Sequence, residues 1–289
     1  MLELTLKKWQ VYMRLMRVDR PIGTYLVAWP ALWALWIAAD GVPAWHLILV
    51  FLLGAFLMRS AGCVINDFAD RHVDGHVERT KNRPLVNKEI GSREALQLFC
   101  VLALLAAGLL FFTNRLTFFL AFVAIFLAML YPFTKRFTHL PQIVLGMAFS
   151  WAVPMAFAAQ TNIVSPIAWQ LYFAVVLWVV AYDTFYAMVD RDDDILIGVK
   201  STAILFGRYD KSIIAMLQVA FIAQMVAIGL AENYGKAYYV GVFFAGGLCV
   251  YQQFIVIDRK KDACFRAFLN NNYVGLSIFL GIVLEFMLR

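Results

Sequence analysis

The sequence is poor in charged residues. Only 15% of its 289 residues are Asp, Glu, Lys or Arg, whereas 63% are hydrophobic and 16% are aromatic. An average soluble domain is about 25% charged. The deficit argues against a soluble protein with a large core, which would need polar helix faces that this chain lacks, and it favours a membrane protein.

The chain also lacks the short motifs of several other protein classes. It contains neither GxxxxGKS/T nor GxGxxG, so nothing in it supports ATP-driven transport. Its four cysteines have no metal-ligand spacing and are expected to be free thiols.

Long apolar runs are abundant instead. A helix needs about 20 largely apolar residues to cross a bilayer, and it satisfies its own backbone hydrogen bonds there. We therefore expect an all-α integral membrane protein with one domain over residues 1–289 and an amphipathic interfacial helix within 1–20. The sequence predicts nine spans, at 22–39, 45–65, 95–113, 116–134, 141–160, 166–188, 212–231, 237–257 and 271–288.

Lysine and arginine are strongly segregated along the chain. All 25 lie in the N-terminal segment or after the second, fourth, sixth and eighth spans, except Arg59, Arg115, Lys236 and Arg289. Cytoplasmic loops are enriched in these residues, so we expect a cytoplasmic N-terminus. This bias explains the net charge of +6, and no nucleic-acid partner is expected.

The 19 acidic residues are not spread evenly. Two clusters lie at the predicted cytoplasmic ends of the second and sixth spans, within segments 66–92 and 189–210. If the helices continue past the membrane, the i, i+4, i+8 spacing puts each stripe on one helix face. The first stripe consists of Asn66, Asp70 and Asp74, and the second of Tyr186, Asp190 and Asp194.

Carboxylates stacked on one face repel each other unless a cation separates them. Carboxylate and amide oxygens suit a hard cation such as Mg²⁺, which completes its coordination with water and phosphate oxygens. The two clusters therefore predict Mg²⁺ ions shared with a diphosphate; the alternative is a pair of solvated acidic loops. The predicted metal ligands are Asn66, Asp67, Asp70, Asp74, Asp190, Asp193 and Asp194.

Basic residues lie on the same predicted side as the acids, where they could contact phosphate oxygens. The alternative for each is that it only anchors the topology. The candidates for binding the diphosphate are Arg59, Arg79, Lys81, Arg83, Lys135 and Lys200. Tyr182 and Tyr186 are the aromatic residues best placed to line a site near Asp190.

Two segments carry a family resemblance. NDFADRHVDGHVERTKNRP resembles the N-D-x-x-D-x-x-x-D motif of the UbiA family of intramembrane prenyltransferases. YDTFYAMVDRDDDILIGVKSTAILFG resembles the family's second motif, Y-D-x-x-Y-A-x-x-D-x-x-D-D. The stretches LMRVDRPIGTYLVAWPALWAL, YPFTKRFTHLPQIVLG and NNNYVG are similar to bacterial members that act on 4-hydroxybenzoate in ubiquinone biosynthesis.

The resemblance covers essentially the whole chain. It implies nine helices around a cavity whose mouth carries both Asp motifs on the cytoplasmic side of the bacterial inner membrane. It also implies Mg²⁺-dependent transfer of an all-trans polyprenyl group from polyprenyl diphosphate to the carbon ortho to the hydroxyl of 4-hydroxybenzoate. The choice of this acceptor over homogentisate, a naphthoate or haem rests on the resemblance alone. A cation-coupled transporter is less favoured, because its ionisable groups would lie near the midplane.

This interpretation gives the acidic residues their roles. The predicted catalytic residues are Asp70, Asp74, Asp190, Asp194, Tyr186 and Asp183. Asp183 either acts as a base or orients Arg59 or a tyrosine. Arg136 is expected to pair with the acceptor's carboxylate.

Overall fold

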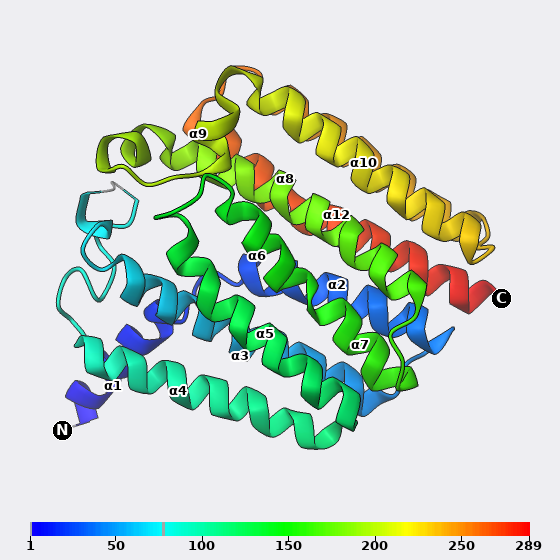
Figure 1. Cartoon of the computed structure of the whole chain (residues 1–289), viewed down its shortest axis with the longest axis horizontal. Helices are drawn as coiled ribbons and strands as arrows, with labels where there is room; N and C mark the ends of the chain where they lie inside the picture. The colour runs from blue at the N-terminus through cyan, green and yellow to red at the C-terminus, as the bar shows by residue number, and fades with distance from the viewer. Residues whose placement is uncertain (1, 77–78) are drawn as a thin grey trace.

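The computed structural model describes residues 2–76 and 79–289, and these residues form helices and connecting loops without any strand (Figure 1). In chain order the elements are α1 (Leu2–Leu15), α2 (Ile22–Ala39), α3 (Trp45–Asp70), η1 (Asp74–His76), α4 (Ser92–Leu109), η2 (Leu110–Phe112), α5 (Arg115–Thr134), α6 (Pro141–Ser150), α7 (Ala152–Thr161), α8 (Pro166–Ile197), α9 (Thr202–Phe206), η3 (Gly207–Tyr209), α10 (Asp210–Ala231), α11 (Lys236–Ile255) and α12 (Lys261–Leu288).

Eight helical segments among the described residues are long and apolar enough to cross a membrane. The protein is therefore a multi-pass membrane protein, as predicted. The count of nine is not confirmed, because α11 is not among the eight. However, short loops join α11 to α10 and α12, and the two chain ends lie at opposite ends of the bundle (Figure 1). Since an odd number of crossings separates the ends, nine remains our expectation.

The outer faces of the helices are apolar. Phe119 and Phe126 of α5 are 53% and 62% exposed, and Phe243 of α11 is 76% exposed. In water such a surface would be costly, whereas in a bilayer it faces hydrocarbon chains.

The core is centred on Trp178 of α8, which is fully buried. Its ring stacks on Phe221 of α10 with 5.8 Å between centroids and lies 5.3 Å from Trp33 of α2. The Trp178 indole N–H donates to Oδ1 of Asn271 in α12 (2.8 Å), and Trp33 donates to the carbonyl oxygen of Gly275 (3.1 Å). Polar contacts of this kind join helices where no water competes.

Three differences from the predicted helices are the most informative. The span predicted at 141–160 is two helices, because Pro154 lacks the N–H that would bond the Ser150 carbonyl and so interrupts the backbone ladder. α12 begins at Lys261 rather than at 271, since its first turns are polar and escape a search for apolar runs.

The third difference concerns the first Asp motif. α3 ends at Asp70, so the prediction that Asn66, Asp70 and Asp74 form one helical stripe is wrong. Asp74 lies in the short helix η1 instead. Val73, which is β-branched, and Gly75 both have low helix propensity and disfavour continuation of the helix. The Thr80 hydroxyl donates to the Asp74 carbonyl across the turn (2.8 Å). In contrast, α8 runs to Ile197 and carries Tyr186, Asp190 and Asp194 on a single helix, as predicted.

α1 forms a helix within the predicted segment 1–20, and its interfacial position stays a prediction. The buried Leu15 and Met16 pack against Ala61 and Val64 of α3. This contact brings the following residue, Arg17, to the end of α3 that carries the first Asp motif.

Candidate active site

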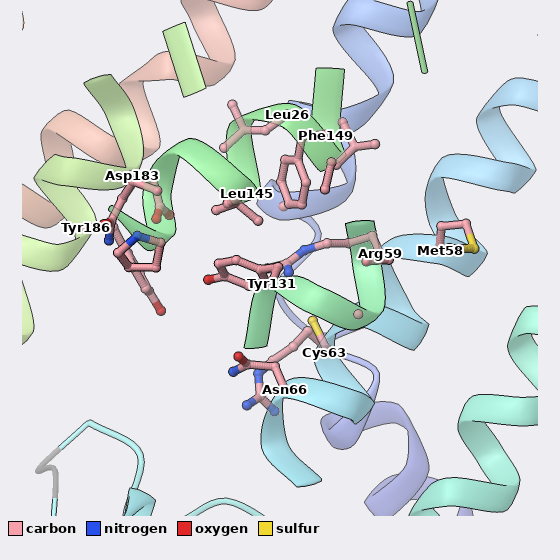
Figure 2. Close-up of a pocket in the computed structure, with 18 of the residues that line it drawn as sticks. Leu26, Met58, Arg59, Cys63, Asn66, Tyr131, Leu145, Phe149, Asp183 and Tyr186 are labelled. Carbon is pink, nitrogen blue, oxygen red and sulfur yellow. The ribbon is translucent and has the colours of Figure 1, made fainter. Parts of the chain in front are cut away.

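A cavity of about 1060 Å³ lies between α2, α3, α4, α5, α6, α7 and α8, and the first turns of α12 close one side of it. Figure 2 shows Arg59 and Asn66 of α3, Tyr131 of α5 and Asp183 of α8 gathered around this space. One end of the cavity is lined by charged side chains and the other by alanine and phenylalanine.

The charged end brings together both predicted Asp motifs. Every residue predicted to bind metal or to act in catalysis lines the cavity: Asn66, Asp67, Asp70, Asp74, Asp183, Tyr186, Asp190, Asp193 and Asp194. Within the described residues, however, no group of three acidic, histidine or cysteine side chains is assembled closely enough to hold a metal ion. Basic side chains lie between the carboxylates instead.

Arg83 joins two carboxylates of the first motif. Its Nη1 donates to Oδ2 of Asp74 (2.6 Å) and lies 2.9 Å from Oδ1 of Asp67. Asp67 also accepts a hydrogen bond from Nη2 of Arg17 (2.9 Å), while the Lys135 ammonium pairs with Asp70. Burial raises the pKa of Asp74 above its ordinary value, and the neighbouring Arg83 opposes that rise.

Arg79 makes the corresponding contact with the second motif. Its Nε donates to Oδ1 of Asp190 (2.9 Å) and its Nη2 donates to Oδ2 (2.5 Å), which is a bidentate pair. The same guanidinium lies over the ring of Tyr186, 4.6 Å from its centroid. Lys200 also lines the cavity, and its backbone N–H donates to the carbonyl of Lys135 (3.1 Å).

Two predicted bases are not brought to the cavity. Lys81 is exposed and lies outside the lining, as does Arg136. Nη2 of Arg136 donates to the carbonyl oxygen of Ala69 (2.6 Å), so this arginine caps the end of α3 from outside.

Arg59 lies deeper than the other bases. It projects from α3 two turns before Asn66, and its guanidinium is 6.0 Å from the ring centroid of Phe149 on α6. Tyr131, Tyr182 and Tyr186 line the same cavity. Within the described residues it makes no hydrogen bond or ion pair, unlike Arg79, Arg83 and Lys135.

No sequence pattern marked two further residues of the site. In the sequence, Arg17 was only one of the basic residues that indicate a cytoplasmic N-terminus. Its contact with Asp67 could not be predicted, because that contact depends on how α1 packs against α3. Gln142, in the first turn of α6, also lines the cavity. Its Oε1 accepts the backbone N–H of Thr202 (3.0 Å), and its side chain faces Asp183. A lone glutamine at the start of an apolar run has no pattern that would mark it.

The apolar end of the cavity lies against α4 and α5. Small residues line it, namely Ala103, Ala106 and Ala107 of α4 and Ala121, Ala124 and Ala128 of α5. Phe118 and Phe122 line the same region, yet they are 44% and 61% exposed. The cavity therefore reaches the outer apolar surface of the bundle at this end.

The fold and the cavity define a multi-pass, all-helical membrane protein whose interior joins a charged end to an apolar end. The family model described as the UbiA prenyltransferase family matches residues 27–278. The chain belongs to this family.

Similar proteins agree with this assignment. The 4-hydroxybenzoate octaprenyltransferase of Saccharophagus degradans is 58% identical over 274 residues, covering 95% of this chain and 92% of the relative. That of Vibrio cholerae is 56% identical over 282 residues, covering 98% of this chain and 99% of the relative.

Solved structures share the fold at low sequence identity. A UbiA homologue from Aeropyrum pernix in its apo form superposes with a TM-score of 0.80 at 22% identity, covering 90% of this chain and 97% of the other. A homologue from Archaeoglobus fulgidus bound to GPP and Mg²⁺ has a TM-score of 0.67 at 17% identity, covering 94% and 99%.

Proposed function

We propose that this protein transfers the polyprenyl group of an all-trans polyprenyl diphosphate to 4-hydroxybenzoate, at the ring carbon ortho to the hydroxyl, and releases diphosphate. The reaction belongs to ubiquinone biosynthesis in the bacterial inner membrane, with the charged mouth and the N-terminus on the cytoplasmic side. Two relatives named for this acceptor, at 58% and 56% identity over almost the whole chain, support the choice of 4-hydroxybenzoate.

One observation carries the proposal: a single cavity has a charged end and an apolar end that reaches the outer surface. A polyprenyl diphosphate has the same two parts. Its diphosphate fits among the bases at the mouth, and its tail fits along the alanines of α4 and α5. A long tail can leave past Phe118 and Phe122 of α5 into lipid, so the cavity does not need to enclose it.

The donor atoms at the mouth fit Mg²⁺. All are carboxylate or amide oxygens, and Oδ1 of Asp70 is buried with no hydrogen-bond partner among the described residues. Bound Mg²⁺ supplies positive charge that stabilises the departing diphosphate. The residues that would hold it are Asn66, Asp67, Asp70, Asp74, Asp190, Asp193 and Asp194.

The bases at the mouth have two successive partners in this proposal. Arg79, Arg83 and Lys135 neutralise aspartates in the free protein. When the donor binds and the aspartates turn to Mg²⁺, these side chains donate charge-assisted hydrogen bonds to phosphate oxygens. Lys200, on the same rim, is a further phosphate contact.

Arg59 is the better candidate for binding the acceptor's carboxylate. It lies inside the cavity without an ion pair among the described residues, whereas Arg136 lies outside. A carboxylate held at Arg59 sets the phenol ring between the diphosphate and the apolar walls. Asp183 lies two turns before Asp190 on α8, and its charge interacts with that of Arg59. It therefore lies beside the phenol ring of the acceptor.

The chemistry follows from this arrangement. The allylic carbon–oxygen bond of the donor breaks, and its electron pair leaves with the diphosphate. The apolar walls exclude water from the allylic cation, and the ring of Tyr186 stabilises it once Arg79 has moved to the diphosphate. The ortho carbon of the phenol attacks the cation, and the ring proton passes to Asp183 as aromaticity returns.

The test is prenylation by the purified protein in liposomes, with labelled 4-hydroxybenzoate and an all-trans polyprenyl diphosphate. We expect a lipid-soluble labelled product that requires Mg²⁺ and disappears with EDTA. Parallel reactions with homogentisate and a dihydroxynaphthoate test the acceptor. Product from either of these, and none from 4-hydroxybenzoate, would overturn the assignment of the acceptor while leaving the reaction class intact.

A further inference from the structure

We infer that Gly23 is a positioning residue for Arg59 and thereby sets the affinity for the carboxylate of the acceptor. The inference rests on the proposed function. It begins with an unusually close approach between α2 and the Arg59 side chain.

Gly23 is buried in the first turn of α2 and lines the cavity. A Cβ atom built on it would lie 2.2 Å from Nε of Arg59, 2.6 Å from Nη2 and 2.7 Å from Cζ. These three atoms are the nearest ones, and all belong to the guanidinium. The absence of a side chain at position 23 therefore makes the space that the guanidinium occupies.

The guanidinium also has an aromatic neighbour. The centroid of the Phe149 ring lies 6.0 Å from Cζ of Arg59, so the guanidinium is near both the α2 backbone and an aromatic ring. No carboxylate among the described residues pairs with it. Packing, together with the charge of nearby Asp183, holds this cation ready in the cavity, and a group held in place in advance binds its ligand without the cost of ordering it.

An alanine at position 23 would push the guanidinium away by about 1 Å, because ordinary van der Waals contact begins near 3.4 Å. A displacement of that size in a substrate-positioning group typically lowers enzyme activity on the order of 10- to 100-fold. The change does not threaten the helix itself, since Ala is a better helix former than Gly. Gly23→Ala is therefore expected to raise KM for 4-hydroxybenzoate roughly 10-fold or more and to leave KM for the polyprenyl diphosphate unchanged.

The experiment is a double-mutant cycle with Gly23→Ala and Arg59→Lys, which removes the guanidinium. KM for each substrate is measured in wild type, in both single variants and in the double variant. If Gly23 acts through Arg59, then Gly23→Ala raises the acceptor KM in the wild-type background and adds less than about 2-fold in the Arg59→Lys background. Gly247→Ala in α11, where a Cβ meets open space, is the control and should match wild type.

Three results would overturn the inference. The acceptor KM of Gly23→Ala could equal that of wild type, or Gly23→Ala could raise it equally in both backgrounds, or it could raise the donor KM instead. If Gly23→Ala gives no product, calorimetric binding of 4-hydroxybenzoate to the detergent-solubilised variant replaces KM, and unchanged binding rejects the inference. Failure of the proposed function is distinct, because wild type itself would then form no product from 4-hydroxybenzoate.

Discussion

Replacing Arg83 tests whether its guanidinium occupies the position at which a divalent cation binds. Arg83 is the one side chain that contacts Asp67 and Asp74 together in the described part of the chain. Arg83→Met keeps most of the aliphatic stem and removes the charge. We expect the Mg²⁺-free variant to be clearly less stable than wild type, because two carboxylates then lose a cation.

The structure gives the size of the effect. The side chains of Asp67 and Asp74 are only 2% and 8% exposed, and that of Arg83 is 12% exposed. Removing one partner of a buried pair costs about 3–5 kcal/mol. Asp67 keeps its bond from Arg17, so the lower end, about 3 kcal/mol, is expected. For a chain of this size that corresponds to a fall in melting temperature of roughly 6–12 °C.

The deficit also depends on pH. Burial raises the pKa of Asp74, so around that pKa the folded state binds more protons than the unfolded state. The free energy of unfolding therefore falls as pH rises through this window. Without Arg83 the pKa of Asp74 rises further, so the difference between variant and wild type should be larger at pH 8 than at pH 5.

The assay is thermal unfolding of detergent-solubilised protein, followed by tryptophan fluorescence, with and without Mg²⁺; diphosphate is omitted because Arg83→Met also removes a proposed phosphate contact. A ligand at 100 times its Kd adds about 2.7 kcal/mol, and this addition should be greater in Arg83→Met, whose aspartates are free to coordinate. Lys260→Met is the control, since among the described residues the Lys260 ammonium pairs only with the exposed Asp258, at 3.9 Å. An unchanged melting temperature without Mg²⁺, or equal stabilisation of variant and wild type by Mg²⁺, would refute the reasoning.

Three further predictions concern activity. Asp70→Asn and Asp190→Asn should each lower kcat by about 100-fold or more, because each removes a charged oxygen from the diphosphate end of the cavity; initial rates at saturating substrates check this, and rates within 3-fold of wild type would contradict it. Arg136→Ala should leave KM for 4-hydroxybenzoate within about 2-fold of wild type, because Arg136 lies outside the cavity. A large rise in this KM would indicate that Arg136, and not Arg59, binds the carboxylate of the acceptor. Ala106→Phe should favour short donors, since a ring would fill the apolar end; a competition between geranyl and octaprenyl diphosphate measures the shift, and an unchanged ratio would place the tail elsewhere.

The fold was predictable wherever a single helix carries the signal. Apolar runs located the membrane helices, and the spacing of Tyr186, Asp190 and Asp194 put them correctly on the continuous helix α8. The same argument failed at Asp74, because a periodicity says nothing about whether the helix continues through Val73 and Gly75. Asp74 nevertheless reaches the cavity, since the turn after α3 and the bond from Arg83 bring it there.

Contacts between distant segments could not be read from the sequence. Five of the six bases proposed to bind the diphosphate line the cavity, whereas Lys81 and Arg136 do not. The charge of a residue and its predicted side of the membrane were not enough to distinguish the two groups. The depth of Arg59 depends on the missing side chain at Gly23, 36 positions earlier, and no spacing rule connects the two. The same holds for Arg17, which an apolar contact of α1 carries to Asp67.

The balance of charge in the cavity predicts how donor and metal bind. Eight acidic and eight basic side chains line it, so the free site is formally neutral. A diphosphate adds several negative charges to a region where Asp67 and Asp70 are almost out of water, and there uncompensated charge is costly. Donor and Mg²⁺ should therefore bind together. Calorimetry should show that EDTA weakens binding of polyprenyl diphosphate by about 100-fold or more and leaves binding of 4-hydroxybenzoate nearly unchanged. Tight donor binding in EDTA would mean that Arg79, Arg83 and Lys135 suffice to neutralise the diphosphate, and that the aspartates serve only to hold these bases in the free protein.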